Sequence, residues 1–292
     1  LGEFREELKK RAGLRALGGP PNLVFVILES FRAAEVGALG SDAGVTPRFD
    51  ALARRGLLFR NFFSNGFQTR DALLGSYCST LPNYGPSQMR FYPHVKALGL
   101  PELLRARGYA TAWYHNADAE FDRRREFLAR HGFDRIVDEY DFPLLSERLG
   151  WGISDVALMR MAAERMRALP EPFFASLLTV SNHHPYTVPR EFRKHSAAGE
   201  HGRYLDTFAY TDHALGLLFD LTAADPFFRR TIFFVYADSS NRQPAPRPVR
   251  TTRDWLALSH HLPLLIVAPW LERGETLDAP CSHVDLPPTV LD

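Results

Sequence analysis

The chain has 292 residues, of which 45% are hydrophobic and 12% aromatic, so it is long enough to bury a substantial core. The sequence contains 35 Lys and Arg against 34 Asp and Glu, and this balance shows neither the basic excess typical of nucleic-acid binding nor the acidic excess typical of disorder. The two cysteines, Cys78 and Cys281, lie far apart and form no C-x-x-C pair, which excludes a thiol-redox motif or a zinc finger of that kind.

The two ends of the sequence differ in character from the middle. Residues 1–21 are charged and amphipathic and end in Gly-Gly-Pro-Pro, a composition that indicates a linker or juxtamembrane stalk. The other end, "SHVDLPPTVLD", stops at the predicted start of a helix, so we expect residues 22–292 to form one large domain that is truncated at its C-terminus. No apolar stretch approaches the roughly 18 to 20 residues that a membrane-spanning helix needs.

Short apolar segments alternate along the chain with longer amphipathic ones. The apolar segments predict strands at 22–29, 109–115, 173–182, 231–238 and 262–270. Between them, apolar residues recur at three- and four-residue spacing, which predicts helices over 47–56, 69–81, 100–108, 153–169 and 204–223. Strands that are apolar on both faces and separated by helices indicate an α/β fold, a doubly wound and mostly parallel sheet with helices on both faces. The Pro- and Arg-rich segment 241–255 is predicted to be an irregular surface loop.

Four of the predicted strands end in side chains that can bind a metal ion, namely Glu29, His115, the pair His183 and His184, and Asp238. In a doubly wound sheet, ligands bind at the carboxyl ends of the strands, so these side chains are expected at one edge. Carboxylates and imidazoles gathered there supply the oxygen and nitrogen ligands that Zn²⁺ or Mn²⁺ accepts. An acid that follows a strand is, taken alone, more often a solvated loop residue or a helix cap than a metal ligand, and the case rests on four strands that end in such side chains.

A second candidate is Thr69, at the point where the polar segment "FFSNGFQTRDALLGSY" runs into a helix. A hydroxyl there faces the positive end of the helix dipole and free backbone N–H groups, a setting that favours an alkoxide and binds phosphate-like anions. The alternative is that Thr69 only caps the helix, helped by Asp71 in the first turn. On this stretch alone, the capping interpretation is the simpler one.

The order of the motifs adds a resemblance that no single motif carries. The sequence resembles the extracytoplasmic catalytic domain of the lipoteichoic acid synthase type, a sulfatase-like domain of the alkaline phosphatase superfamily. The similarity covers roughly residues 22 to 292 and rests on seven motifs in the same order: "NLVFVILES", "FFSNGFQTRDAL", "YHNADAEFDRRREFLARHGFDRIVDE", "TVSNHHPY", "VYAD", "LPLLIVAP" and "SHVDLPPTVLD".

The resemblance implies a role for each matching residue. Glu29, Thr69 and Asp238 would bind one divalent ion, commonly Mn²⁺ with Mg²⁺ or Zn²⁺ as alternatives, and Thr69 would also be the nucleophile. The substrate head group would contact His115, Arg124 and His183. From the residues alone, a structural role is as good an explanation as a substrate contact for two of them. His115 would then be a hydrogen-bonded histidine at a strand end, and Arg124 an exposed residue on a helix face. Three further imidazoles could approach the site: His260, His261 and His283.

The resemblance also implies a reaction and a location. A metal-bound threonine alkoxide would attack the phosphorus of a phosphatidylglycerol-like lipid, expel diacylglycerol and hold phosphoglycerol until an acceptor hydroxyl takes it. The donor would be a phospholipid head group, and the acceptor a glycerol, a glycan or water. The domain would be extracytoplasmic, periplasmic or at the cell surface, and held near its lipid by an anchor outside this sequence. No nucleic-acid partner is expected.

Two residues depart from the family pattern. The family has tryptophan two residues before the arginine matched by Arg124, where this chain has Asp122, so the pocket is expected to be more polar. The family has Asp-His after the fourth strand, where this chain has Asp238 and Ser239. A neutral hydroxyl is a weak metal ligand, so metal affinity is expected to fall. Cys78, in "CSTLPNY", also lacks the C-x-P-x-R setting from which classical sulfatases form their nucleophile.

Three interpretations of Ser239 therefore remain open. The first is an active metal-dependent phosphotransferase or phosphodiesterase in which Ser239 takes the fourth ligand position. The second is a catalytically impaired pseudoenzyme that keeps the fold and a phosphate-binding pocket. The third is an engineered substitution at position 239 in an otherwise active enzyme.

Overall fold

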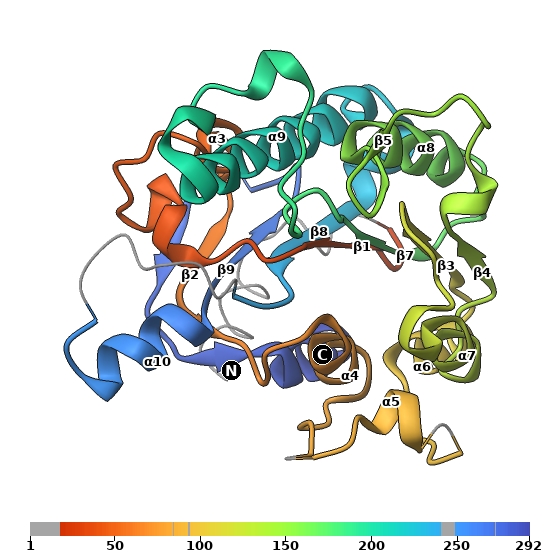
Figure 1. Ribbon diagram of the computed structural model, residues 1–292. Helices are drawn as coiled ribbons and strands as arrows, with labels where there is room; N and C mark the ends of the chain where they lie inside the picture. Colours follow the sequence, from red (N-terminus) through yellow and green to blue (C-terminus); the bar gives the residue numbers. More distant parts are fainter. Residues whose placement is uncertain (1–17, 84, 93, 241–248, 272) are drawn as a thin grey trace.

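A nine-stranded sheet forms the centre of the protein in this computed structural model, which describes residues 18–83, 85–92, 94–240, 249–271 and 273–292 (Figure 1). Most of the predicted stalk at 1–21 lies outside the described residues. The strands are ordered β10-β2-β9-β8-β1-β7-β3-β4, with β11 also paired to β2. Their bounds are β1 Asn22–Leu28, β2 Leu57–Phe63, β3 Ala110–His115, β4 Arg135–Val137, β7 Phe173–Leu178, β8 Thr231–Ala237, β9 His261–Val267, β10 Glu275–Leu277 and β11 Cys281–Ser282; a separate hairpin pairs β5 Arg148–Leu149 with β6 Gly152–Ile153.

The sheet is mostly parallel, as predicted, but two features differ from the prediction. The last predicted strand, β9, runs antiparallel to both of its neighbours, β8 and β2. Its sequence is apolar on both faces like that of a parallel strand, so nothing in the pattern reveals its direction. β2 was not predicted, because Arg60 and Asn61 interrupt its apolar run and a bulge shifts its register between Phe59 and Phe62.

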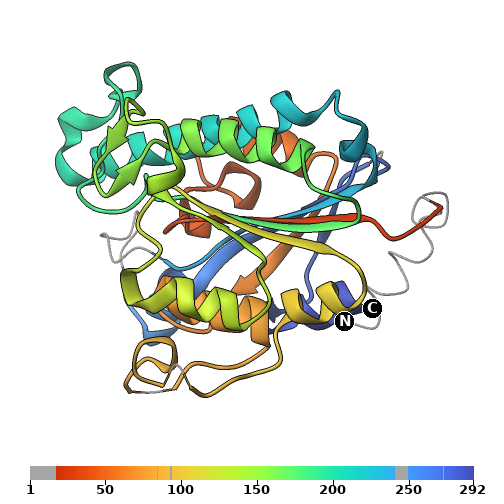
Figure 2. The ribbon, with the colours of Figure 1, turned by 90° about the vertical axis from the view of Figure 1, so that its right-hand side faces the viewer.

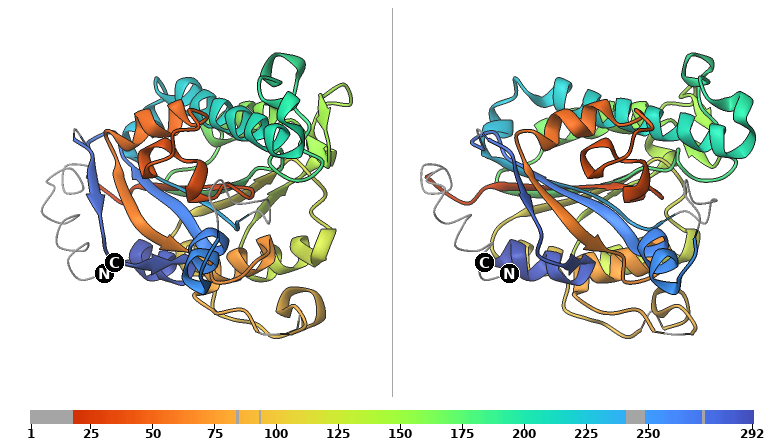
Figure 3. Two further views of the ribbon diagram at one scale, coloured as in Figure 1. Left: turned by 60° about the vertical axis from the view of Figure 1, so that its left-hand side comes forward. Right: turned by 90° about the vertical axis from the view of Figure 1, so that its left-hand side faces the viewer.

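Helices cover both faces of the sheet, as predicted (Figures 1 and 2). One layer contains α3 (Pro47–Ala53), α8 (Asp155–Arg167) and α9 (Gly199–Thr222), and Figure 3 shows α3 beside α9. The opposite layer contains α4 (Thr69–Cys78), α6 (Leu100–Ala106), α7 (Arg124–Arg130) and α11 (Leu286–Leu291), with the short α5 (Gln88–Phe91) beyond α4. No helix within the described ranges is long and apolar enough to cross a membrane.

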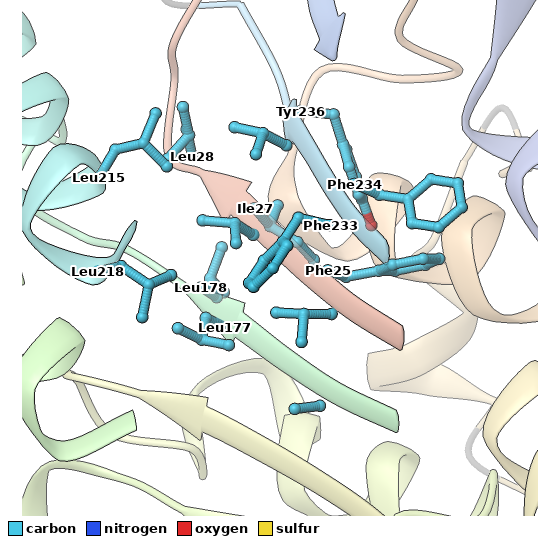
Figure 4. Close-up of a cluster of buried hydrophobic side chains, with 14 of the residues drawn as sticks. Phe25, Ile27, Leu28, Leu177, Leu178, Leu215, Leu218, Phe233, Phe234 and Tyr236 are labelled. Atoms are coloured by element: carbon cyan, nitrogen blue, oxygen red, sulfur yellow. The ribbon is translucent and has the colours of Figure 1, made fainter. Parts of the chain in front are cut away.

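The core lies on both faces of β1 and β8, which explains why their sequences are apolar throughout (Figure 4). On the α9 side, the ring of Phe233 packs 4.8 Å from that of Phe219, centroid to centroid. On the α4 side, Phe25 packs at 5.1 Å from Phe234 and at 5.6 Å from Tyr236. These contacts hold the two strands in register, and that register positions the residues that follow them.

The predicted loop at 241–255 is only partly a loop. Residues 241–248 lie outside the described part of the chain, but α10 (Thr252–His260) occupies the end of the segment and leads directly into β9. Thr251 caps this helix by accepting a hydrogen bond from the backbone of Asp254, a capping box that the Pro and Arg content of the segment obscured.

Candidate active site

Glu29 and Asp238 come together because β1 and β8 pair in parallel and end at the same level. Leu28 is the register partner of Ala237, so Glu29 and Asp238 are the next residues on adjacent strands. Ser30 links them, because its backbone N–H donates to Asp238 Oδ1 at 2.8 Å and its hydroxyl donates to Glu29 Oε1 at 2.8 Å. Two buried carboxylates therefore flank one residue at the carboxyl edge of the sheet.

Thr69 reaches this pair from α4. Its hydroxyl donates to Glu29 Oε2 at 3.3 Å. The helix is capped by Gln68, which forms a capping box with Asp71, so Thr69 is the first residue inside the helix and its hydroxyl has no capping role. The capping interpretation of Thr69 is therefore wrong, and the hydroxyl lies at the positive end of the helix dipole beside a carboxylate.

Neighbouring groups compensate the negative charge of these two carboxylates only in part. Burial, followed by the negative charge of Asp238, raises the pKa of Glu29 well above its ordinary value, although Ser30 and the charge of Arg124 act in the opposite direction. Asp238 Oδ2 is buried and has no hydrogen-bond partner among the described residues. A buried, unpartnered carboxylate oxygen next to a second carboxylate is the chemistry of a cation site, and it fits a divalent ion.

Arg124 is a buried cation whose charge interacts with both carboxylates. It is 7% exposed, its Nη1 has no hydrogen-bond partner in the described part of the chain, and its guanidinium lies 5.9 Å from the ring centroid of Trp113. Burial lowers the pKa of Arg124, while the charges of Glu29, Asp122 and Asp238 raise it. The alternative that Arg124 is a solvated helix residue is therefore wrong, because its side chain is buried.

Part of this group lines a cleft of about 590 Å³. The lining includes five of the predicted site residues, Glu29, Thr69, Arg124, His183 and Ser239, whereas Asp238 is buried outside it. An aromatic wall of Phe121 and Trp151 forms one side, with ring centroids 5.9 Å apart, and Trp151 packs 4.2 Å from the His183 ring. Two hydrogen bonds hold the turn that carries His183, because Asp155 Oδ1 accepts from the backbone N–H groups of Val180 and Ser181.

The other predicted histidines lie outside the lining of this cleft, apart from His184, which is exposed within it. His115 is buried, and its Nδ1–H donates to the carbonyl of Leu178 at 2.8 Å. Burial and the nearby Arg124 charge lower the pKa of His115 well below its ordinary value, which keeps the imidazole neutral. His260 contacts the hydroxyl of Ser64, and His261 the carbonyl of Arg60.

His283 lies against the strand that carries Asp238. Its Nε2–H donates to the carbonyl of Ala237 at 2.8 Å, and burial lowers its pKa to about 4. Because this bond holds the ring on the backbone, His283 does not replace the histidine that the family has at position 239. Ser239 instead donates its hydroxyl to Asp238 Oδ1 at 3.2 Å. The described residues contain no group of three or more His, Cys, Asp or Glu that could hold a metal ion.

Two arginines and an acid complete the cleft wall and were not predicted as a unit. Arg70 pairs with Asp122 at 2.9 Å, and Arg90 lies 3.8 Å from the same carboxylate. Asp122 and Arg123 both have φ of 58°, and this left-handed turn precedes Arg124 at the start of α7. Arg70 follows Thr69 directly, so adjacency to the predicted nucleophile was a usable signal; Arg90 and Trp151 stand in segments without any pattern that marks them.

The chain is similar to known proteins over most of its length. A family model described as Sulfatase matches residues 21–292. Lipoteichoic acid synthase 2 of Bacillus subtilis (strain 168) is 25% identical over 288 residues, which cover 92% of this chain and 44% of that protein. Phosphoglycerol transferase I of Xanthomonas campestris pv. campestris (strain B100) is 28% identical over 216 residues, covering 67% of this chain and 30% of that protein. The chain thus spans less than half the length of these relatives.

Solved structures show the same fold. A protein in the alkaline phosphatase superfamily from Vibrio parahaemolyticus matches with a TM-score of 0.81 at 28% identity, covering 94% of this chain and 66% of that chain. The lipoteichoic acid synthase LtaP from Listeria monocytogenes matches with a TM-score of 0.80 at 23% identity, covering 93% and 71%. These matches confirm the predicted resemblance and the predicted α/β fold.

Proposed function

The chain belongs to the sulfatase family, a family of enzymes, and on that premise we propose that it transfers a phosphoryl group of the phosphoglycerol type from a membrane-lipid head group. The observation that carries the proposal is the contact of the Thr69 hydroxyl with Glu29 at 3.3 Å, at the N-terminus of α4 and at the floor of a cleft that Arg124 also lines. The relatives named lipoteichoic acid synthase and phosphoglycerol transferase support the substrate class.

In this mechanism Thr69 is the nucleophile. Its Oγ1 forms a bond to the phosphorus of the lipid phosphodiester, Glu29 accepts the hydroxyl proton, and the bond from phosphorus to the diacylglycerol oxygen breaks. The diacylglycerol oxygen takes up this proton from Glu29 as it leaves. An acceptor hydroxyl then forms a bond to the phosphorus and loses its proton, the bond from phosphorus to Thr69 Oγ1 breaks, and Oγ1 takes up that proton to restore the threonine hydroxyl. Arg124 neutralises charge on the phosphoryl oxygens, and its burial strengthens that interaction.

The residues at the floor of the cleft fit one divalent cation. Glu29, Asp238 and the Thr69 hydroxyl would hold it, with the hydroxyl of Ser239 as the fourth protein group. This all-oxygen set favours Mn²⁺ or Mg²⁺ over Zn²⁺, which prefers nitrogen and sulfur ligands. When bound, the ion would lower the pKa of the Thr69 hydroxyl and offset phosphate charge.

The aromatic wall and His183 would form the outer part of the substrate site. Phe121 and Trp151 present apolar faces to the cleft, while His183 presents a ring nitrogen. Its Nδ1 interacts with the carbonyl of His184 at 2.9 Å, which fixes the ring beside Trp151. We place the glycerol or glycan of the acceptor against this wall. His115, neutral and outside the cleft lining, would support Arg124 rather than contact the head group itself.

A second candidate function is a pseudoenzyme that binds a phosphate ester without turning it over. The observation that favours it is Ser239, because the described residues lack a third His, Cys, Asp or Glu at the metal site. The cleft would still bind an anion through Arg124, whose Nη1 is buried without a protein partner in the described ranges.

The test measures turnover of bis(p-nitrophenyl) phosphate with and without Mn²⁺ in the wild type and in Thr69→Ala and Thr69→Ser. The transferase proposal expects Mn²⁺-dependent turnover, loss of at least about 100-fold in Thr69→Ala and a partial loss in Thr69→Ser. Peptide mass spectrometry after incubation with a phosphatidylglycerol analogue should then find phosphoglycerol on Thr69. Turnover that survives in Thr69→Ala would remove threonine as the nucleophile. Phosphate binding without turnover at any metal concentration supports the pseudoenzyme.

A further inference from the structure

The connection between α4 and α6, residues 79–99, is described at 79–83, 85–92 and 94–99, and it exposes apolar side chains to solvent. Five of them are large and between 42% and 63% exposed: Leu81, Phe91, Tyr92, Val95 and Leu98. Isolated exposed apolar residues are common on protein surfaces, but a concentration in one short connection marks an interaction surface. In Figure 1 this connection and α5 project away from the sheet, beyond α4.

The same stretch of sequence carries basic residues and no acidic ones. The sequence has no Asp or Glu between Asp71 and Glu102, while Arg90, His94 and Lys96 lie within the connection. The Arg90 side chain is 59% exposed and the Lys96 side chain 51% exposed. Arg90 lies 3.8 Å from Asp122 and Lys96 pairs with Glu102 at 2.8 Å, so the acidic partners of both cations come from outside the connection. Aromatic and aliphatic side chains interleaved with cations, without acids, are the composition of segments that lie in the interface of an anionic membrane.

Part of the described connection packs against the domain. Ser87 caps α5 by accepting a hydrogen bond from the backbone of Arg90, and Met89 is only 4% exposed. Behind it lies an apolar groove of about 90 Å³ whose lining includes Met89, Val95 and Phe127 of α7. The exposed side chains are therefore displayed from a backbone that packs against the domain.

The connection also adjoins the cleft. Arg90 lines the cleft through its side chain, while the next residue, Phe91, is exposed at 57%. A partner surface that binds the connection would therefore also lie against the opening of the cleft.

We propose that residues 79–99 dock the domain on an anionic lipid bilayer. Phe91, Val95 and Leu98 enter the interfacial region of the lipid, and Lys96 meets the head-group phosphates. The reason for docking rests on the proposed function, because a lipid donor enters the cleft from the membrane surface. The binding itself does not depend on catalysis, so the two proposals fail separately.

The test is flotation of the protein with vesicles of phosphatidylglycerol and phosphatidylcholine in equal amounts, and with vesicles of phosphatidylcholine alone. The double variant Val95→Ser/Leu98→Ser is compared with Leu144→Ser/Leu145→Ser, which removes two side chains that are 103% and 98% exposed between β4 and β5. In Figure 1 that control segment lies toward the α8 side of the sheet, away from α5. A further variant, Lys96→Gln, removes one cation.

The expected result is binding to anionic vesicles that falls at least about tenfold in Val95→Ser/Leu98→Ser, about fivefold in Lys96→Gln and not at all in the control. Turnover of a soluble diester should be unchanged in all three variants. Equal losses in the two double variants, or equal binding to both vesicle types, would overturn the proposal. So would a wild-type dimer in sedimentation velocity that Val95→Ser/Leu98→Ser dissociates, because the occupant would then be a second copy of the chain.

Discussion

The charge of Asp238 can be removed without changing its shape, and the metal-free protein should become more stable as a result. Asn at this position keeps Oδ1 as the acceptor for the Ser30 backbone and the Ser239 hydroxyl. It also replaces Oδ2, which has no partner among the described residues, by an amide group. Two unit charges about 5 Å apart repel by about 3 kcal/mol at an effective dielectric constant of about 20.

The net gain is smaller than this repulsion, because Arg124 attracts Asp238 and that attraction is lost too. We therefore expect a gain of about 2 kcal/mol, which corresponds to a rise of about 4 °C in Tm for a chain of this size. The gain depends on Glu29 being ionised. Its pKa is raised in the folded protein, so the destabilisation develops as pH rises from the ordinary value of 4.5 through the raised pKa. Below pH 4.5 the gain should largely disappear.

The assay is thermal unfolding of chelator-treated protein at pH 4.5 and pH 8, followed by titration with Mn²⁺ at pH 8. The wild type should gain about 2.7 kcal/mol when Mn²⁺ reaches about 100 times its Kd, and Asp238→Asn should gain little. The matched control is Asp155→Asn, another fully buried carboxyl, which accepts hydrogen bonds from Asn116, Val180, Ser181 and Thr211 and should be destabilised by the change. A lower Tm for metal-free Asp238→Asn than for the wild type at pH 8 would refute the inferred repulsion.

Three further changes test the neighbouring groups. Ser239→His should tighten Mn²⁺ binding by about tenfold or more, measured by calorimetry, because it adds a nitrogen ligand next to Asp238; unchanged affinity would place the ion elsewhere. Arg124→Lys should lower kcat/KM for a diester by about 100-fold with little change in Mn²⁺ affinity, because a buried guanidinium that faces the phosphoryl oxygens has been replaced by a point charge. Asp122→Asn should lower KM for an anionic diester severalfold, because it releases Arg70 and Arg90; a raised KM would show that Asp122 contacts the substrate favourably.

The sequence predicted the parts of this site that follow from strand ends. Glu29 and Asp238 each follow an apolar run, and the rule that parallel strands end at one edge is enough to bring them together. The helix beginning at Thr69 was visible from its apolar spacing. The pattern could not predict the register of the two strands, which depends on how they pack. Leu28 pairs with Ala237, and this register allows Ser30 to bridge the two carboxylates.

Other features were hidden because their signals are not periodic. β9 runs antiparallel to β8 because α10 lies at the edge of the sheet where β8 ends, as the hydrogen bond from Ser240 to the carbonyl of Leu258 shows, and leads directly into β9 there. Arg124 stands in the run "DRRRE", which is typical of a solvated helix face, and only the left-handed residues Asp122 and Arg123 before α7 turn it inward. The aromatic wall pairs Phe121 with Trp151, which lie far apart in the sequence, in a tertiary contact that no local pattern encodes.

The two departures from the family pattern act on the same quantity, the charge of the cleft. Three guanidinium groups line the cleft, those of Arg70, Arg90 and Arg124. The carboxylates of Glu29 and Asp122 also line it, and that of Asp238 is buried next to Glu29. With Glu29 ionised, the cleft is therefore close to neutral and gains little attraction for a phosphodiester from its own side chains. Asp122 contributes the third carboxylate, and Ser239 leaves the acidic pair without an imidazole. A divalent cation would tip the balance towards anion binding, so substrate affinity and cation affinity should rise and fall together in this chain.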